Sequence, residues 1–205
     1  MRVKTEAKRQ SIVDAAAGVF MEKGYEAASM AEIASRAGGS KATLYSYFPS
    51  KEELFLMVMK TLAEERMSQA HARLTADGDL RAALLRFGEQ MLRNLLSPEI
   101  AALRGIVLGE GRRSGVGQLF FDNGPAIGWG KLAAFLEGQM QAGRLRQAKP
   151  WTAAVHLLAL LEAEFMEWFI VGAREMPTDE AISEAVVAAV DVFLAGYAPS
   201  SSEGD

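Results

Sequence analysis

The stretch from Ser29 to Phe48, SMAEIASRAGGSKATLYSYF, decides the fold that we expect for this chain of 205 residues. Ser29 is followed three residues later by Glu32, the spacing of a capping box at the start of a helix. The two consecutive glycines, Gly38 and Gly39, end that helix, and Ser40 can cap a second one. The stretch therefore predicts two short helices joined by a tight glycine turn.

An amphipathic segment precedes this pair. Between about Thr5 and Lys23 the apolar residues recur at the spacing of one helical face, and Gly24 follows as a C-terminal glycine. Two short helices at a sharp angle, braced by a preceding helix, describe a helix-turn-helix. An ordinary helical hairpin with a solvated outer face would have the same pattern, so the two interpretations stay open at this point.

The second short helix, from Lys41 to Tyr47, presents two different surfaces. Leu44 and Phe48 are separated by four residues and are expected to face inward. The outward positions are polar, aromatic or cationic: Ser40, Lys41, Thr43, Tyr45 and Tyr47. Lysine and hydroxyl groups bind phosphates, while Ala42 and Thr43 suit base edges or a thymine methyl group. These side chains indicate a DNA groove as the partner of this surface.

The rest of the chain predicts helices throughout. Helix-forming residues dominate, and alternating runs of β-branched residues are missing. We therefore expect an all-α fold of about nine helices, in which a three-helix head precedes a larger helical body. The expected ranges beyond the head are 50–74, 80–96, 97–111, a bent or broken glycine-rich segment over 111–143, 150–172 and 177–197. The end of the chain, residues 198–205, is small and polar and is expected to be a disordered tail.

Composition excludes several classes of site. The sequence has no cysteine, which excludes disulfides, thiolate metal sites and thiol nucleophiles. Its two histidines, His71 and His156, have no acidic residue three positions before them, so a Glu-x-x-His metal motif is absent. We expect no metal and no cofactor. The first residues contain no apolar signal segment, and the most apolar stretch carries too many ionisable groups to span a bilayer, so the expected location is the cytoplasm.

Charge is distributed unevenly along the chain. Residues 1–51 hold eight basic and five acidic residues, whereas the remaining 154 residues hold fourteen basic and twenty-one acidic residues. A basic head on an acidic body is a weak indication that the head binds a polyanion.

The pattern over residues 9–54 is similar to the DNA-binding head of the TetR family of transcriptional regulators. It consists of IxxAAxxxFxxxGY from Ile12 to Tyr25, IAxxAG from Ile33 to Gly38, and SKATLYxYFxSKExL from Ser40 to Leu54. Gly39 stands where a valine is frequent, and Ala42 stands where a glycine is frequent. Both differences bear on the stiffness of the turn and on which bases are read.

The resemblance implies a role for each matching position. Ser29 would bind a phosphate; Lys41, Ala42 and Thr43 would meet base edges in the major groove. Tyr45 and Tyr47 would pack on the sugar-phosphate backbone, and Lys51 would contact a phosphate. The basic residues before the first helix, Arg2, Lys4, Lys8 and Arg9, would add backbone contacts, although a solvated helix residue explains Arg9 equally well. The DNA-binding set is Ser29, Ser40, Lys41, Ala42, Thr43, Tyr45, Tyr47 and Lys51.

For the body, the resemblance implies binding of a small-molecule effector and a homodimer through the last two helices. We therefore divide the chain into a DNA-binding domain over residues 1–50 and a ligand-binding and dimerisation domain over 51–197. The body is weakly similar to AcrR-like and AefR-like members. The segment 150–172 is apolar on more than one face, as a helix with two packing partners would be, although a single thick core in one chain would explain it too. Candidate effector-binding residues are Phe87, Met91, Ile106, Val107, Phe120, Phe121, Trp129, Met140, His156 and Glu164. His156 and Glu164 are expected two turns apart on one helix. For each of the candidate effector-binding residues, packing in the hydrophobic core is the competing explanation.

The expected function is a ligand-responsive transcriptional regulator, with repression as the expected direction. Such a dimer would bind a near-palindromic operator in double-stranded DNA and be released by a hydrophobic or amphipathic effector. One alternative is a helical protein that binds small molecules and no longer binds DNA. An enzyme that uses Glu162, Glu164 or Glu167 with His156 is the other, and no nucleophile, phosphate loop or metal cluster supports it.

Overall fold

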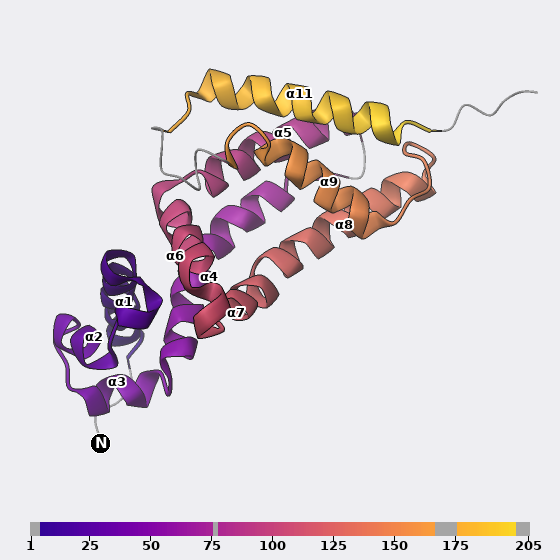
Figure 1. Cartoon of the computed structure of the whole chain (residues 1–205). Helices are drawn as coiled ribbons and strands as arrows, with labels where there is room; N and C mark the ends of the chain where they lie inside the picture. Colours follow the sequence, from indigo (N-terminus) through magenta and orange to yellow (C-terminus); the bar gives the residue numbers. More distant parts are fainter. Residues whose placement is uncertain (1–4, 76–77, 167–175, 200–205) are drawn as a thin grey trace, which may run out of the picture. The chain divides into compact units, whose positions relative to one another are not determined.

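The computed structural model describes residues 5–75, 78–166 and 176–199, and all regular structure within these ranges is helical (Figure 1). The prediction of an all-α fold with a helix-turn-helix head is confirmed. The chain divides into two compact units, Met1–Glu64 with Pro98–Pro125 and Glu65–Ser97 with Ala126–Asp205. This grouping does not follow the predicted boundary after Ser50, because two later helices pack with the head. No helix in the described ranges is both long enough and apolar enough to cross a membrane.

The first unit contains the predicted head. Its helices are α1 (Glu6–Ala27), α2 (Met30–Arg36), α3 (Lys41–Tyr47), the first part of α4 (Lys51–His71), α6 (Pro98–Ser114) and α7 (Val116–Asn123). Helix α1 packs against both α2 and α6, α2 packs against α3, and α6 packs against α7. The common core includes Phe20, Ile33, Leu44, Phe55 and Leu103, each at most 1% exposed.

Serine caps begin the helices of the head where the sequence predicts them. The Oγ of Ser29 accepts a hydrogen bond from the amide of Glu32 at 3.2 Å, and that of Ser40 accepts from the amide of Thr43 at 3.1 Å. Ser50 caps α4 in the same way at 3.1 Å. Because each bond satisfies an amide that has no partner within its helix, it fixes the residue at which that helix begins.

Glycines break the chain at the predicted places. Gly24 has a φ of 83° and a ψ of 176° and kinks α1 near its C-terminal end. Gly115, with a φ of 76°, separates α6 from α7, and Gly124 separates α7 from α8 (Pro125–Gln141). The predicted broken helix over 111–143 is therefore confirmed.

The second unit contains the end of α4 together with α5 (Leu80–Leu95), most of α8, α9 (Pro150–Glu162) and α11 (Asp179–Tyr197). Helix α11 packs along both α5 and α9 (Figure 1). Phe87, Leu132, Leu157, Val186 and Phe193 contribute to one core, and each is at most 1% exposed.

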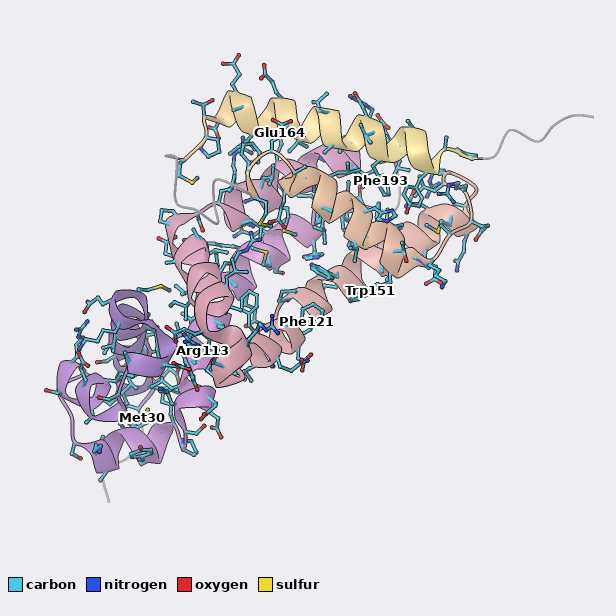
Figure 2. All side chains as sticks on the ribbon, in the orientation of Figure 1. Met30, Arg113, Phe121, Trp151, Glu164 and Phe193 are labelled. Atoms are coloured by element: carbon cyan, nitrogen blue, oxygen red, sulfur yellow. The ribbon has the colours of Figure 1, made fainter. Side chains whose placement is uncertain are left out.

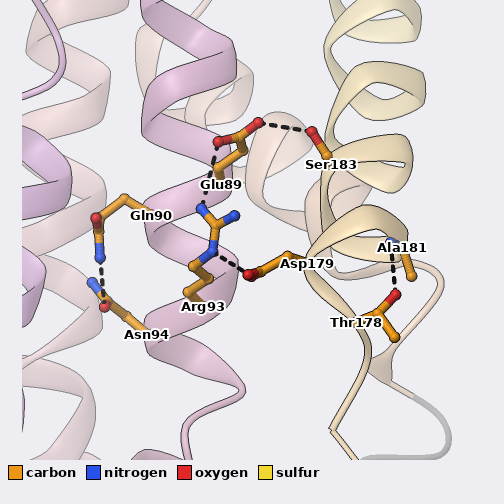
Figure 3. A network of polar contacts seen from close by, with 8 residues as sticks. All are labelled: Glu89, Gln90, Arg93, Asn94, Thr178, Asp179, Ala181 and Ser183. Atoms are coloured by element: carbon orange, nitrogen blue, oxygen red, sulfur yellow. Dashed lines mark hydrogen bonds and ion pairs between the residues drawn. The ribbon is translucent and has the colours of Figure 1, made fainter.

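Polar contacts at the surface join α5 to α11 (Figure 3). The Arg93 Nε donates to the Asp179 carboxylate at 2.9 Å, and Ser183 Oγ lies 2.9 Å from the Glu89 carboxylate. An exposed pair such as Arg93 and Asp179 contributes about 0–1 kcal/mol, so these contacts orient α11 more than they stabilise it.

Two predicted helix ends are wrong. Helix α4 ends at His71, before the predicted Leu74, and α9 ends at Glu162, although its apolar pattern predicted a helix to residue 172. The chain turns after Glu162, where the amide of Phe165 donates to the carbonyl of Glu162 at 3.0 Å. The remainder of that predicted helix, at 167–172, lies outside the described residues, as do residues 200–205 of the predicted tail.

We expect Gly88→Ala to lower the free energy of unfolding of the second unit by about 1–3 kcal/mol, the usual effect of overpacking a core. An added Cβ at Gly88 would lie 2.8 Å from Leu161 Cδ2 and 2.8 Å from Val186 Cγ1, so α5 could not keep its distance from α9 and α11. Urea denaturation measures the change. Gly138→Ala is the control, because an added Cβ on this exposed face of α8 meets no atom within 4 Å. A Gly88→Ala protein as stable as the unaltered chain would contradict this packing.

Candidate nucleic-acid interface

Helix α3 exposes part of the surface that the sequence predicts: Ser40, Lys41 and Tyr45 are exposed, whereas Thr43 and Tyr47 are half-buried. Leu44 is 1% exposed and Phe48 2%, and both lie in the core of the first unit. On the opposite side Lys41 and Ala42 are exposed, and Tyr45 is 45% exposed although it is a large aromatic residue. The buried pair holds α3 on the head, which leaves its outer side chains accessible to a partner.

Hydroxyl groups on α3 are held in a chain of short hydrogen bonds. Ser40 Oγ and Thr43 Oγ1 lie 2.9 Å apart, and Ser46 Oγ donates to the carbonyl oxygen of Thr43 at 2.6 Å. These bonds restrict the rotamers of Ser40 and Thr43, the two hydroxyl residues that flank Lys41 and Ala42. A surface with restricted side chains loses less conformational entropy when it binds.

The start of α1 is tied to the helix-turn-helix. Tyr47 is half-buried, and its hydroxyl oxygen accepts a hydrogen bond from the amide of Thr5 at 2.9 Å. Lys8 Nζ donates to the carbonyl oxygens of Ala37 at 2.5 Å and Gly38 at 3.3 Å. Lys8 therefore satisfies carbonyls at the C-terminal end of α2, a role different from the DNA-backbone contact that the resemblance implied.

Ion pairs fix α2 against α1. The two guanidinium nitrogens of Arg36 donate to the two carboxylate oxygens of Glu22 at 2.6 and 2.8 Å, and Lys23 pairs with Glu32 at 2.7 Å. The hydrogen bonds and positive charge of Arg36 hold the pKa of Glu22 below its ordinary value. This bidentate contact sets the orientation of α2, the helix whose exposed cap residue Ser29 is the predicted phosphate ligand.

Lys51 has partners that the sequence did not predict. Its Nζ donates to three carbonyl oxygens of the segment between α1 and α2: Tyr25 at 2.8 Å, Ala28 at 3.1 Å and Glu26 at 3.2 Å. The ammonium also lies 4.4 Å from the centre of the Tyr25 ring, and burial raises the pKa of Tyr25, which keeps that phenol neutral. An ammonium has three donors, so these carbonyls occupy all of them in this structure.

Comparison with known proteins shows the family. A model of the tetR family of bacterial regulatory proteins matches residues 12–58, the region that contains α2 and α3. A model described as the C-terminal domain of AefR-like transcriptional repressors matches residues 82–199, more than half of the chain. The chain belongs to the TetR family of transcriptional regulators.

Solved structures of TetR regulators match nearly the whole length of the chain. The flavonoid-responsive regulator FrrA is 32% identical, with 96% of this chain and 100% of that one covered and a TM-score of 0.79. A TetR-family regulator from Mesorhizobium loti MAFF303099 is 25% identical, with 96% and 100% covered and a TM-score of 0.82. The transcriptional activator FasR of Mycolicibacterium smegmatis is 40% identical over 83 residues, which span 40% of this chain and 38% of that protein. All three relatives are named as regulators, in agreement with the expectation that the chain is a transcriptional regulator and not an enzyme.

The predicted effector-binding residues of this TetR regulator fall in two groups. In the first unit Ile106, Val107 and Phe120 are partly buried against the core, while Phe121 on α7 is 37% exposed (Figure 2). In the second unit Phe87, Met91 and Met140 are at most 5% exposed, and Trp129 is partly buried beside them.

The prediction that His156 and Glu164 share one helix is wrong. His156 lies on α9, whereas Glu164 lies in the turn beyond its end (Figure 2), and both residues are exposed. The Nδ1 of His156 is hydrogen-bonded to the Tyr197 hydroxyl at 2.8 Å, a contact between α9 and α11. The helical spacing that motivated the pairing of His156 with Glu164 therefore does not hold, and His156 instead joins α9 to α11.

His71 is the polar group beside Phe87 that sequence reasoning missed. The two rings meet edge to face with centroids 5.7 Å apart. His71 Nδ1 lies 2.7 Å from the carbonyl oxygen of Met67, and Nε2 lies 2.9 Å from that of Gly128. The His71 ring therefore joins the end of α4 to the backbone of α8. No sequence pattern around His71 predicts its contact with Gly128 on α8, because the partner is a backbone carbonyl 57 residues away.

Proposed function

We propose that this TetR-family protein is a cytoplasmic, ligand-responsive repressor that binds a near-palindromic operator as a homodimer. One observation carries the proposal: Leu44 and Phe48 are buried, while Lys41 and Tyr45 on the other side of α3 are exposed and Thr43 is half-buried beside them. That outer surface combines a cation, a hydroxyl with a methyl group, and an aromatic ring, which suit a phosphate, a base edge and the sugar-phosphate backbone.

In the proposed complex α3 enters the major groove. Lys41, Ala42 and Thr43 meet base edges, because they lie in the first turn of an exposed recognition helix. Tyr45 and Tyr47 pack on the DNA backbone. The hydroxyls of Ser29 and Ser40 donate to phosphates while their oxygens cap α2 and α3. Lys51 leaves the set of phosphate ligands in this proposal, since its ammonium already binds three carbonyls.

The exposed surface of α11 supports dimerisation through the last two helices. Val187 is 38% exposed and Val192 58%, and Ala188 and Ala195 continue the same side of the helix. A second copy of this surface would cover these apolar side chains around a two-fold axis. Such a dimer binds two half-sites when its recognition helices are about 34–36 Å apart, one turn of B-DNA.

A hydrophobic or amphipathic effector is the proposed signal. Phe87, Met91 and Met140 are apolar, and two of the three are methionines, whose flexible side chains adapt to varied ligands. The name of FrrA, a structural relative over the full chain, describes a response to flavonoids, which are aromatic molecules. The AefR-like match favours repression, whereas the name of FasR describes an activator. Helix α4 runs continuously from the first unit into the second, so an effector that binds the second unit can bias the position of the head.

Selection of DNA by the purified chain tests the proposal. A library of random duplexes is incubated with the protein at physiological salt, and bound duplexes are sequenced after several rounds. We expect a two-fold-symmetric motif with half-sites one helical turn apart. The mass of the protein–DNA complex, measured by sedimentation, should correspond to an even number of protein chains. A folded protein that enriches no motif would contradict DNA binding, and a single asymmetric half-site bound by one chain would contradict the dimer.

We expect Lys41→Ala to weaken binding of the selected duplex by about 1–3 kcal/mol if Lys41 reads a base, with a changed preference at one base pair. If Lys41 only contacts a phosphate, affinity for all sequences falls alike and the salt slope decreases by about one. Fluorescence anisotropy at several salt concentrations separates the two results. Lys60→Ala removes the same charge from an exposed position on α4 and serves as the control. Equal affinities for the Lys41→Ala and unaltered proteins would contradict the proposed docking of α3.

A further inference from the structure

The backbone of Glu26 is held from two sides by opposite charges. Its amide donates to the Glu110 carboxylate on α6 at 2.6 Å, and its carbonyl oxygen accepts from Lys51 Nζ on α4 at 3.2 Å. Lys51 also binds the carbonyls of Tyr25 and Ala28. All of these residues belong to the first unit, so the segment that leads from α1 into α2 is clamped between α4 and α6.

The backbone at Gly24 is shaped for the carboxylate. A Cβ added at Gly24 would collide with Glu110 Oε1 and would lie 3.1 Å from Glu110 Cδ. The φ of 83° at Gly24 turns the chain there, and the amide of Glu26 then donates to Glu110 on α6. Glycine therefore serves two purposes at this position: it adopts the turn, and it leaves space for the Glu110 side chain.

This clamp lies directly before α2 in the chain. Residue 26 is three residues before the α2 cap at Ser29, and α2 packs directly on α3. A hydrogen bond from an amide to an ionised carboxylate is shorter and about twice as strong as one between neutral groups. The position of the helix-turn-helix therefore depends on a specific side chain of α6, a helix that is not part of the helix-turn-helix.

We propose that Glu110 is a positioning residue for DNA binding, which holds α2 and α3 in the orientation that the operator requires. Glu110 acts through the Glu26 amide and makes no contact with DNA. The inference rests on the proposed docking of α3. It implies that any event that displaces α6 weakens DNA binding by releasing this amide, while Lys51 still holds the carbonyl side of the segment.

Electrostatics and positioning predict opposite results for Glu110. Removing a carboxylate from a protein that binds a polyanion lowers repulsion, so by charge alone Glu110→Ala would bind DNA more tightly. Positioning predicts weaker binding. The direction of the change in affinity therefore separates the two effects. Weaker binding by Glu110→Ala cannot result from the loss of negative charge alone.

The experiment compares three variants on the duplex that the unaltered protein selects. We expect Glu110→Ala to raise Kd about tenfold with an unchanged salt slope, because no phosphate contact is lost. Glu110→Gln keeps an oxygen that can accept from the Glu26 amide, and its Kd should stay within about threefold of that of the unaltered protein. Asp122→Ala, which removes an exposed carboxylate of α7 in the same unit, should leave Kd unchanged or lower it.

Amide hydrogen exchange gives a readout that needs no DNA. The Glu26 amide should be protected in the unaltered protein and in Glu110→Gln, and it should exchange faster in Glu110→Ala while amides in the middle of α1 stay protected. The inference would be overturned if the Glu26 amide exchanged at the same rate in Glu110→Ala as in the unaltered protein. A Kd of Glu110→Ala within twofold of that of the unaltered protein would overturn it too. If Glu110→Ala does not fold, a Glu110→Gln protein with an exposed Glu26 amide and undiminished DNA affinity would overturn it as well. An unaltered chain that selects no duplex would instead overturn the proposed function, and this inference with it.

Discussion

Replacing Phe55 with alanine is expected to lower the free energy of unfolding of the first unit by about 3–5 kcal/mol. Phe55 lies on α4 and is completely buried. Its ring meets that of Phe20 edge to face at 5.0 Å and that of Tyr25 at 5.0 Å. The substitution removes a large apolar surface and two aromatic contacts, and it leaves a cavity at the point where α1 and α4 meet.

Urea denaturation followed by intrinsic fluorescence and by near-ultraviolet circular dichroism measures this loss. Phe121→Ala is the matched control, because that ring on α7 is 37% exposed and less burial is lost. We expect the control to change stability by less than half as much as Phe55→Ala. A loss below about 1 kcal/mol for Phe55→Ala would mean that the aromatic cluster does not hold the head together. Such a result would also weaken the case for a rigid platform beneath α3.

Helix starts could be predicted from the sequence with accuracy, because each depends on local chemistry. Ser29 and Ser40 cap α2 and α3 as their spacing indicates. A cap needs one side-chain oxygen and one amide two or three residues away, and both lie within the same short segment of sequence. The inward and outward faces of α3 were predictable for the same reason: a helical period relates Leu44 to Phe48 directly.

The helix end at Glu162 and the partners of Lys51 could not be predicted in this way. The sequence after Glu162 continues without glycine or proline through residue 171, so no local signal stops the helix. Lys51 binds backbone carbonyls, which every residue has, and only the path of the chain between α1 and α2 brings three of them together. The resemblance indicated that Lys51 matters in the head, but the contacts it makes are a property of the tertiary structure.

Gly24→Ala is expected to combine backbone strain with the loss of the Glu110 contact. A φ of 83° with a ψ of 176° lies in a region that is essentially reserved for glycine, and a non-glycine residue there costs about 1–3 kcal/mol. The added Cβ would also displace the Glu110 carboxylate. We expect lower stability in urea denaturation and a Kd for the selected duplex at least tenfold higher, measured by fluorescence anisotropy.

Two further variants separate strain from the lost contact. Gly38→Ala, at a φ of 66° with no atom within 4 Å of an added Cβ, carries strain without collision and should keep more DNA affinity than Gly24→Ala. In a double-mutant cycle, Glu110→Ala should add little further loss of affinity in a Gly24→Ala background, since the first substitution has already broken the contact. Additive losses would mean that the two residues act on DNA binding separately. The cycle therefore measures whether Gly24 and Glu110 are energetically coupled in positioning the recognition helix α3.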